Sequence, residues 1–430
     1  MSRPSVTAAR IVAIVATASV AACGVSSTGA PDTGSSSGLS GTPIQVGVSV
    51  SLTGAFKDDG QAVLRGYQLW ASDVNTHDGL LGRPVKLVVL NDNSNPNTAA
   101  SNYTRLITQD HVDLTLGPFS SLLTIPAAQV AHRHGYAMVE GSGTAPAVYA
   151  ASLQNLFAVS APVANQLEPF AHWVASMPFG IRPRTAAYAM VDDPFADPPV
   201  RAAQATLEKA GVTTAYSNAS APYQDTSPAA LAADARQVAA RNPQIVVIGS
   251  VDVPTLSAFI NEFEKLRFNP RMLIATSGPD QGRAFLQAIG SISNADGVMV
   301  PNGWYGDLSD PLSHVMVQEY IARYGGTASD INADVAEAYS AGQVMADAVQ
   351  NVGLSQQKII GFLHSGVLLN TVQGPASWSR YVASQPSGQN TKALSFVFQW
   401  QPVANFVQVL SSAGAPSKTI IAQKEAWTTR

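Results

Sequence analysis

Strand-like and helix-like segments alternate along the chain, and this alternation limits the fold more than any other feature of the sequence. The apolar run Ile44–Val50 is followed by a segment with apolar residues on one helical face, at Val63, Leu64, Tyr67, Trp70 and Val74. Further strand-like runs occupy 85–90 and 111–116. Strands that alternate with helices at this spacing form βαβ units, which build a parallel sheet. We therefore predict an α/β fold.

A second alternating series begins near Asn155. Its strand-like runs lie at 185–191, 212–216, 244–248, 271–275 and 297–300, and a late pair lies at 395–401 and 405–410. A chain of 430 residues exceeds the size at which a single core is usual. We therefore predict two lobes, each with its own sheet.

The stretch from Gly117 to Pro146 is the strongest candidate for a binding site. It contains two loops of small residues, Gly117–Ser121 and Gly141–Pro146, and each loop follows a strand-like run. In open parallel sheets, ligands bind at the edge where such loops meet. The first loop leads directly into a helix, whose free N–H groups favour an anion. With the hydroxyl groups of Ser121 and Thr144, this arrangement predicts a pocket for a small molecule that carries a carboxylate.

The amino terminus has the features of an export signal. Arg3 and Arg10 are followed by an apolar run of 12 residues, Ile11–Ala22, which is too short to span a bilayer. The run ends in Val20–Cys23, and small residues before a cysteine resemble the lipobox of bacterial lipoproteins. We predict a signal peptide with a lipobox over 1–23 and lipidation of Cys23. The alternative is an ordinary cleavage site beside a stray cysteine.

Residues 24–42 are rich in Gly, Ser and Thr and cannot bury a core, so we predict a flexible tether. Signal, tether and body together predict an exported protein that is lipid-anchored to the outer face of the cell membrane. The chain carries a formal net charge of −4 and has no block of basic residues, which argues against a nucleic-acid partner. Cys23 is the only cysteine, so disulfides and cysteine chemistry are excluded from the mature fold.

Four motifs in order carry a family resemblance: Ser51–Gly54, Asp73–Asn75 leading into Gly79–Val85, Asn91–Asp92, and Gly117–Ser121. Together, and behind a lipobox, they resemble the periplasmic substrate-binding proteins of ABC importers. The resemblance is to the branched-chain amino acid (Leu/Ile/Val) binding family, in its lipoprotein form. It covers about residues 43–410 and is strongest before Pro146.

This resemblance implies a type I periplasmic-binding-protein fold, with two Rossmann-like lobes that have parallel sheets and are joined by a three-crossover hinge. The implied crossovers lie near Ala161, near Asn302 and in the segment around Gln373–Ser384. Lobe 1 is then expected to comprise 43–161 and 302–378, and lobe 2 to comprise 162–301 and 379–430.

The resemblance also implies the polar site residues. Matching of the loops places the serine that holds the ligand carboxylate at Ser121, with Ser120 as the alternative one position away. The further carboxylate contacts fall on Ser142 and Thr144, and the carboxylate that meets the ligand ammonium falls on Asp280. The alternative for each is a purely structural role as a helix cap.

Aromatic residues are expected to complete the pocket. Phe195 falls where the family usually has a tyrosine that stacks on the ligand, so one polar contact is lost here. Phe119, Phe56, Trp304 and Tyr305 are candidates for the walls, and each could equally belong to the core.

Two departures from the family pattern matter. Glu140 ends the strand before the carboxylate loop, and because an inward carboxylate would repel an anion, we expect it to face solvent. Val251–Val253 replaces an aromatic-rich loop, which puts leucine-type specificity in doubt.

The function that follows is an extracytoplasmic solute receptor of an ABC importer. It binds an amino acid, branched-chain-like, or a related small carboxylate, and delivers it to a permease while partner ATPase subunits hydrolyse ATP. No cofactor, metal or enzymatic activity is expected, because no nucleophile–base pair is evident and Gly141–Thr144 lacks the lysine of a phosphate loop. The alternatives are a sensor that passes ligand occupancy to a signalling protein and an exported hydrolase on the same scaffold.

Overall fold

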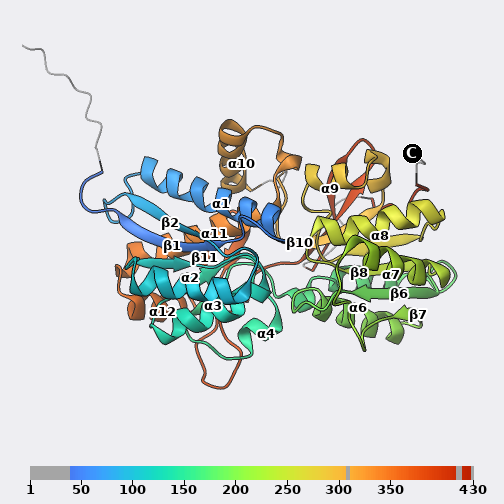
Figure 1. Ribbon diagram of the computed structural model, residues 1–430, viewed down its shortest axis with the longest axis horizontal. Helices are drawn as coiled ribbons and strands as arrows, with labels where there is room; N and C mark the ends of the chain where they lie inside the picture. Colours follow the sequence, from blue (N-terminus) through green and yellow to red (C-terminus); the bar gives the residue numbers. More distant parts are fainter. Residues whose placement is uncertain (1–38, 307–309, 413–418, 428–430) are drawn as a thin grey trace, which may run out of the picture. The chain divides into compact units, whose positions relative to one another are not determined.

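The computed structural model describes residues 39–306, 310–412 and 419–427 (Figure 1). The predicted signal peptide, the lipidation site Cys23 and most of the predicted tether lie outside these residues. Within them, none of the helices combines the length and the apolar character needed to cross a membrane.

The first sheet has five parallel strands in the order β2-β1-β3-β4-β5. Their bounds are β1 Ile44–Val50, β2 Val85–Asn91, β3 Leu114–Leu116, β4 Met138–Glu140 and β5 Leu156–Ala158. Side chains on both faces of the central strands are buried, as expected for a parallel sheet between two helical layers. The expected alternation of strands and helices in the first part of the chain is confirmed.

Helices cover both faces of this sheet (Figure 1). The helices are α1 Lys57–Thr76, α2 Pro96–Thr108, α3 Ser121–Arg133, α4 Pro146–Tyr149, α11 Ala333–Val352 and α12 Gln356–Leu363. On one face, Trp70 of α1 and Val344 of α11 belong to the same core as Val48 of β1. On the other face, Leu106 of α2 and Val130 of α3 share a separate core. Helix α11 therefore packs on this sheet although it begins about 175 residues after the last strand of the sheet.

The second sheet has seven strands in the order β14-β13-β10-β9-β8-β6-β7. Their bounds are β6 Thr185–Met190, β7 Thr213–Ser217, β8 Ile245–Gly249, β9 Met272–Ala275, β10 Val298–Asn302, β13 Phe396–Gln401 and β14 Asn405–Ser411. Strands β6 to β10 are parallel, and the late pair β13 and β14 adds to the edge in antiparallel fashion. The predicted second series of strands is confirmed.

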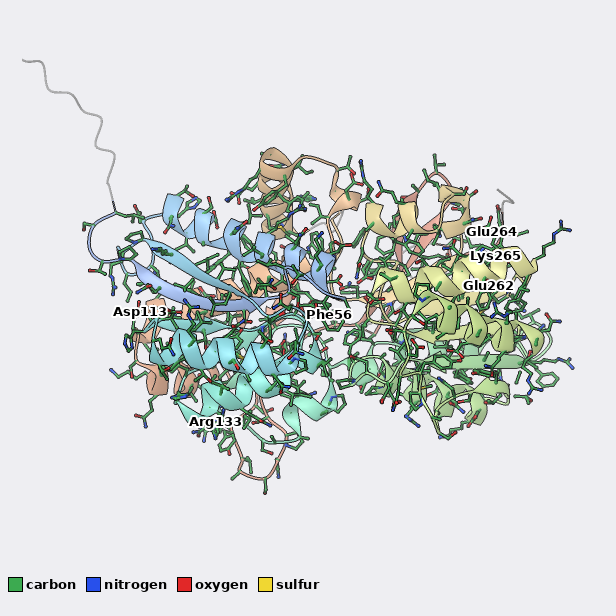
Figure 2. All side chains as sticks on the ribbon, in the orientation of Figure 1. Phe56, Asp113, Arg133, Glu262, Glu264 and Lys265 are labelled. Carbon is green, nitrogen blue, oxygen red and sulfur yellow. The ribbon has the colours of Figure 1, made fainter. Side chains whose placement is uncertain are left out.

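The second sheet also lies between helices. They are α5 Glu168–Ser176, α6 Asp197–Lys209, α7 Pro228–Ala240, α8 Val253–Leu266 and α9 Arg283–Ala288. Phe170 of α5 and Leu207 of α6 pack against one face, while Leu231 of α7 and Phe259 of α8 pack against the other. The exposed Lys265 of α8 forms an ion pair with Glu262 of the same helix, which is largely buried (Figure 2).

The chain passes between the two sheets three times. It leaves the first sheet after β5 through η1 Val163–Asn165, and it returns after β10 through α10 Pro311–Tyr324 and η3 Ala328–Asp330 to α11. The hairpin β11 Leu369–Thr371 and β12 Gly374–Ala376 then precedes β13. The remaining short element is η2 Ile292–Ala295. This topology agrees with the prediction of two lobes, each built on its own α/β sheet.

The segment before β13 lies partly against the first sheet. The carbonyl oxygen of Gly388 accepts a hydrogen bond of 2.8 Å from the Ala158 amide. Asn390 Nδ2 donates to the Val159 carbonyl at 2.7 Å. Part of the segment after residue 379 therefore packs beside β5 before the chain enters β13.

Candidate functional site

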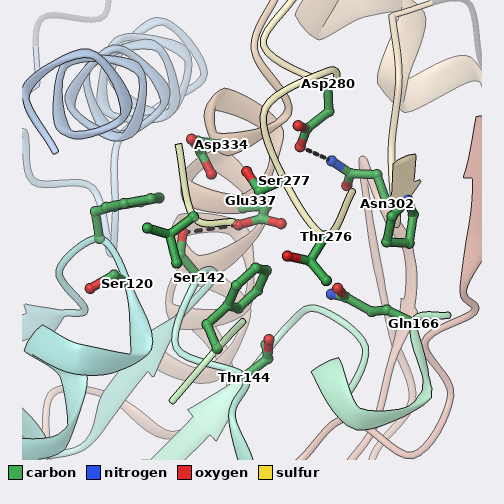
Figure 3. A pocket seen from close by; sticks show the side chains of 14 residues that line it. Ser120, Ser142, Thr144, Gln166, Thr276, Ser277, Asp280, Asn302, Asp334 and Glu337 are labelled. Carbon is green, nitrogen blue, oxygen red and sulfur yellow. Dashed lines mark hydrogen bonds between the residues drawn. The ribbon is translucent and has the colours of Figure 1, made fainter. Parts of the chain in front are cut away.

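A cavity of about 510 Å³, its open mouth included, lies where the carboxyl ends of strands from both sheets meet (Figure 3). The lining residues follow β3, β4, η1, β6, β8 and β9, end β10 or lie near the start of α11: Phe119, Ser120, Ser142, Thr144, Gln166, Phe195, Val251, Thr276, Ser277, Asp280, Pro301, Asn302, Asp334 and Glu337. The cavity thus occupies the edge at which ligands of open α/β sheets bind.

Ser120 and Thr144 form the hydroxyl-bearing wall on the side of the first sheet. Ser120 caps α3, and its backbone φ of 72° lies in the left-handed region, which non-glycine residues rarely adopt. Thr144 is only 2% exposed, and its hydroxyl has no hydrogen bond to any residue that the structure describes. Since Thr144 lines the cavity, its hydroxyl is available to a ligand.

Ser121 does not line the cavity. Its side chain is fully buried, and its Oγ accepts a hydrogen bond of 3.1 Å from the Ala145 amide. This bond joins the two small-residue loops. The structure therefore places Ser120, the alternative one position away, at the cavity, and gives Ser121 a contact that supports the loops.

Asp280 forms the opposite wall, on the loop after β9. One carboxylate oxygen accepts from the Gly278 amide and the other from Asn302 Nδ2, both at 2.8 Å. Asn302 Oδ1 in turn accepts from the Gly303 amide at 2.6 Å, which fixes the asparagine at the end of β10. Burial raises the pKa of Asp280 to about 6, although both hydrogen bonds act in the opposite direction.

The aromatic candidates divide into two groups. Phe119 and Phe195 line the cavity. Phe56 lies behind Phe119 with ring centroids 5.4 Å apart and edge-on geometry, and Figure 2 shows it at the inner end of α1. Trp304 is 1% exposed and donates to Ser313 at 2.8 Å, and it belongs to a smaller neighbouring cavity. Tyr305 lines that neighbouring cavity as well.

Two acidic residues of the cavity, Asp334 and Glu337, were not anticipated. Asp334 lies in the first turn of α11, which Asn332 caps by accepting from the Asp334 amide at 2.8 Å, and Glu337 follows three residues later. Glu337 Oε2 accepts from the hydroxyl of Ser142 at 2.9 Å (Figure 3). The sequence signal was weak, because acids in the first turn of a helix are usually explained by the helix dipole.

The expectation that Glu140 faces solvent is wrong. Its side chain is 0% exposed, and it accepts hydrogen bonds from the Tyr149 hydroxyl at 2.5 Å and from the Gly143 amide. These two hydrogen bonds offset part of the free-energy cost of burying the Glu140 carboxyl group. Burial nevertheless raises the pKa of Glu140 to about 7.

The acids of α11 lie close to a third buried acid, Asp59 of α1. Burial, followed by the proximity of other carboxylates, raises the pKa of Asp334 and that of Glu337 well above the ordinary range. Asp334 has a side-chain hydrogen bond with Asp59, which is 2% exposed and whose pKa is also raised by burial. Within the described ranges, no group of three or more His, Cys, Asp or Glu side chains is arranged to hold a metal ion.

These buried acids predict that the ligand-free protein loses stability as pH rises. Burial holds the pKa of Asp280 and of Asp193 at about 6 and that of Glu140 at about 7, above the values of about 4 in an unfolded chain. Their stabilising contribution is complete below pH 4 and is lost as pH rises through 6 to 7. For Glu140 alone, the change from 4.5 to about 7 corresponds to about 3 kcal/mol.

Thermal unfolding of the ligand-free protein, followed by circular dichroism between pH 4.5 and pH 7, measures this effect below the range in which Lys424, whose pKa burial lowers to about 7, acts in the opposite direction. We expect the melting temperature to fall across that window. A melting temperature that rises or stays constant would show that the three carboxyl groups keep their ordinary pKa values.

The chain belongs to the periplasmic binding protein family, because the model of that family matches residues 43–420. Similar proteins include an "Amino acid binding protein" of Pseudomonas aeruginosa, 32% identical over 26% of this chain and 30% of that protein. A second is the "Leu/Ile/Val-binding protein BraC3" of Rhizobium johnstonii, 26% identical over 43% of this chain and 49% of that protein. These matches span at most half the length of the relatives.

A solved structure with the same fold matches a larger share of this chain than these two relatives do. The branched-chain amino acid transporter substrate binding protein LivJ of Streptococcus pneumoniae, in complex with isoleucine, superposes with a TM-score of 0.70. It is 17% identical, and the match covers 85% of this chain and all of that one. The resemblance drawn from the four motifs is therefore confirmed at the level of family and fold.

Proposed function

We propose that the protein is the extracytoplasmic receptor of an ABC importer and binds an amino acid or a related small molecule in the cavity between its two sheets. The observation that carries this proposal is the placement of Ser120 and Thr144 on one wall and Asp280 on the other. Hydroxyl groups and the first N–H groups of α3 suit a carboxylate, and Asp280 suits an ammonium group. The family membership and the names of the two relatives support the same class of solute.

In this proposal, the chain delivers its solute to a permease, and ATP is hydrolysed by partner subunits. The chain itself performs no catalytic step. Closure of the two lobes around the solute would draw on contacts that both walls supply.

A thermal-shift screen against amino acids, amines, amides and small carboxylates tests the proposal. A ligand at 100 times its dissociation constant stabilises the folded state by about 2.7 kcal/mol, which is a clear shift in melting temperature. Calorimetry on the positive compounds should give one site per chain. If no compound of the panel shifts the melting temperature, a receptor for small metabolites of these classes is contradicted.

We also propose that Cys23 is lipidated and holds the protein at the outer face of the membrane, because Val20–Cys23 resembles a lipobox. The Cys23→Ser variant is expected to move from the membrane fraction to the soluble fraction of fractionated cells. Its solute affinity should be unchanged, because Cys23 precedes the first strand by 20 residues. A Cys23→Ser protein that still sediments with membranes would refute the lipid anchor.

A further inference from the structure

The cavity is acidic on both walls. Three of its 14 lining residues are acids, namely Asp280, Asp334 and Glu337, and none of the 14 is Lys, Arg or His. Figure 3 shows the three carboxylates around one central space. Because burial raises the pKa of Asp334 and Glu337, a cationic nitrogen beside them would favour their ionised form, whereas a ligand whose only charged group is a carboxylate would find no counter-ion among the lining residues.

The carboxylates also form two separate groups. Asp280 is held by Gly278 and Asn302 on the loops of the second sheet. Asp334 and Glu337 lie one helical turn apart on α11, which packs on the first sheet. Two cationic nitrogens on one ligand could engage both walls at once, whereas a single ammonium group can bind one wall or share the carboxyl groups of both.

Hydrogen-bond acceptors without donors add a second, independent observation. Gln166 Oε1 is a buried atom of a lining residue and has no partner among the described residues. Asp59 Oδ1 is also buried and has no partner within the described chain, but Asp59 does not line the cavity. The unpaired oxygen of Gln166 therefore calls for an N–H donor from a ligand, because leaving it unpaired is unfavourable.

We propose that the solute carries two positively charged nitrogen groups, one bound by Asp280 and the other by Asp334 and Glu337. This inference rests on the proposed function and narrows its substrate class to basic amino acids and diamines. A basic amino acid fits both walls, because its carboxylate would meet Ser120 and Thr144. A diamine has the same two cationic nitrogens but no carboxylate to bind the hydroxyl groups of Ser120 and Thr144.

Two matched pairs of compounds test this inference by calorimetry at pH 7.5. Lysine and norleucine share the amino acid head group and differ in the second ammonium. Cadaverine and pentylamine share the chain and differ in the same way. In at least one of the two compound pairs, we expect the dication to bind at least about 30-fold more tightly than the monocation. Removal of one member of a buried charge pair has at least this effect on affinity.

The variant Glu337→Gln keeps the shape of the side chain and removes its charge. It should weaken the better dication about tenfold or more and change the matching monocation less than about threefold. Asp58→Asn is the control, because Asp58 is an exposed acid in the first turn of α1 that does not line the cavity. It should leave the affinity of all four compounds within about threefold, and melting curves confirm that both variants fold.

The relative affinities for lysine and cadaverine distinguish a basic amino acid from a diamine. Tighter binding of lysine than cadaverine assigns a basic amino acid, and the reverse assigns a diamine. Equal or tighter binding of both monocations, or no binding of either dication, overturns the inference. An unchanged preference for the dication in Glu337→Gln overturns it as well. The proposed function fails separately, only if the whole panel of the thermal-shift screen is negative.

Discussion

Replacement of Asp280 by asparagine is expected to weaken solute binding roughly 30-fold to several thousand-fold. Removal of one member of a desolvated charge pair typically costs about 2–5 kcal/mol, because the other charge stays buried without its counter-ion. Asp280 is the only acid on the wall formed by the second sheet. The asparagine keeps the size of the side chain and an oxygen for the Gly278 amide but loses the acceptor for Asn302 Nδ2, so melting curves accompany the affinity measurement and separate loss of binding from loss of stability.

Titration calorimetry of Asp280→Asn with the compound found by screening measures this loss. Thr144→Val provides the comparison, since it removes one hydrogen bond to a charged group and should cost about 1–3 kcal/mol. Asp58→Asn serves as a control for an exposed acid and should bind normally. If Thr144→Val loses more affinity than Asp280→Asn, the ligand has no ammonium group at Asp280, although the receptor function stands.

Replacement of Gly141 by alanine is expected to destabilise the fold by about 1–3 kcal/mol and to weaken solute binding. A Cβ atom at Gly141 would lie 2.7 Å from Glu337 Cβ and 2.8 Å from the carbonyl carbon of the same residue. Because part of this contact is helix backbone, α11 must shift away from the loop after β4. The shift would displace Glu337 from its hydrogen bond with Ser142 and move it relative to the cavity.

Urea unfolding and calorimetry of Gly141→Ala measure the two effects. Gly361→Ala is the matched control, because Gly361 lies in the interior of α12 and an added Cβ meets no atom within 4 Å. There alanine should be neutral or stabilise by about 0.5–1 kcal/mol. A Gly141→Ala protein with unchanged stability and affinity would contradict the view that close contact with this loop positions the acids of α11.

The fold was predictable from the sequence because it depends on a repeated pattern. Continuous apolar runs such as Ile245–Ile248 indicate strands buried on both faces, and the helical patterns between them require crossover connections. The two small-residue loops were predictable as one edge of the site, since parallel strands bring their carboxyl ends together. Asp280 and Thr144 were found by matching loops to a known family.

The other features of the site depend on contacts and backbone conformations that the local sequence pattern does not reveal. Helix α11 follows the loop at Gly141 by about 190 residues, so its acids reach the cavity only through packing on the first sheet. Burial of Glu140 depends on the hydroxyl of Tyr149, nine residues later in the chain. Whether Ser120 or Ser121 faces the cavity is decided by the left-handed backbone conformation at Ser120. A repeating pattern of apolar residues carries none of this information.

A crystal structure of the protein with the solute found by screening tests the account most directly. We expect one solute molecule between the two sheets, with its nitrogen groups at Asp280 and at the acids Asp334 and Glu337. If it has a carboxylate, that group should lie at Ser120 and Thr144. A saturating solute bound elsewhere, for example in the surface hollow beside Trp173, with no contact to Asp280, would contradict the proposed site.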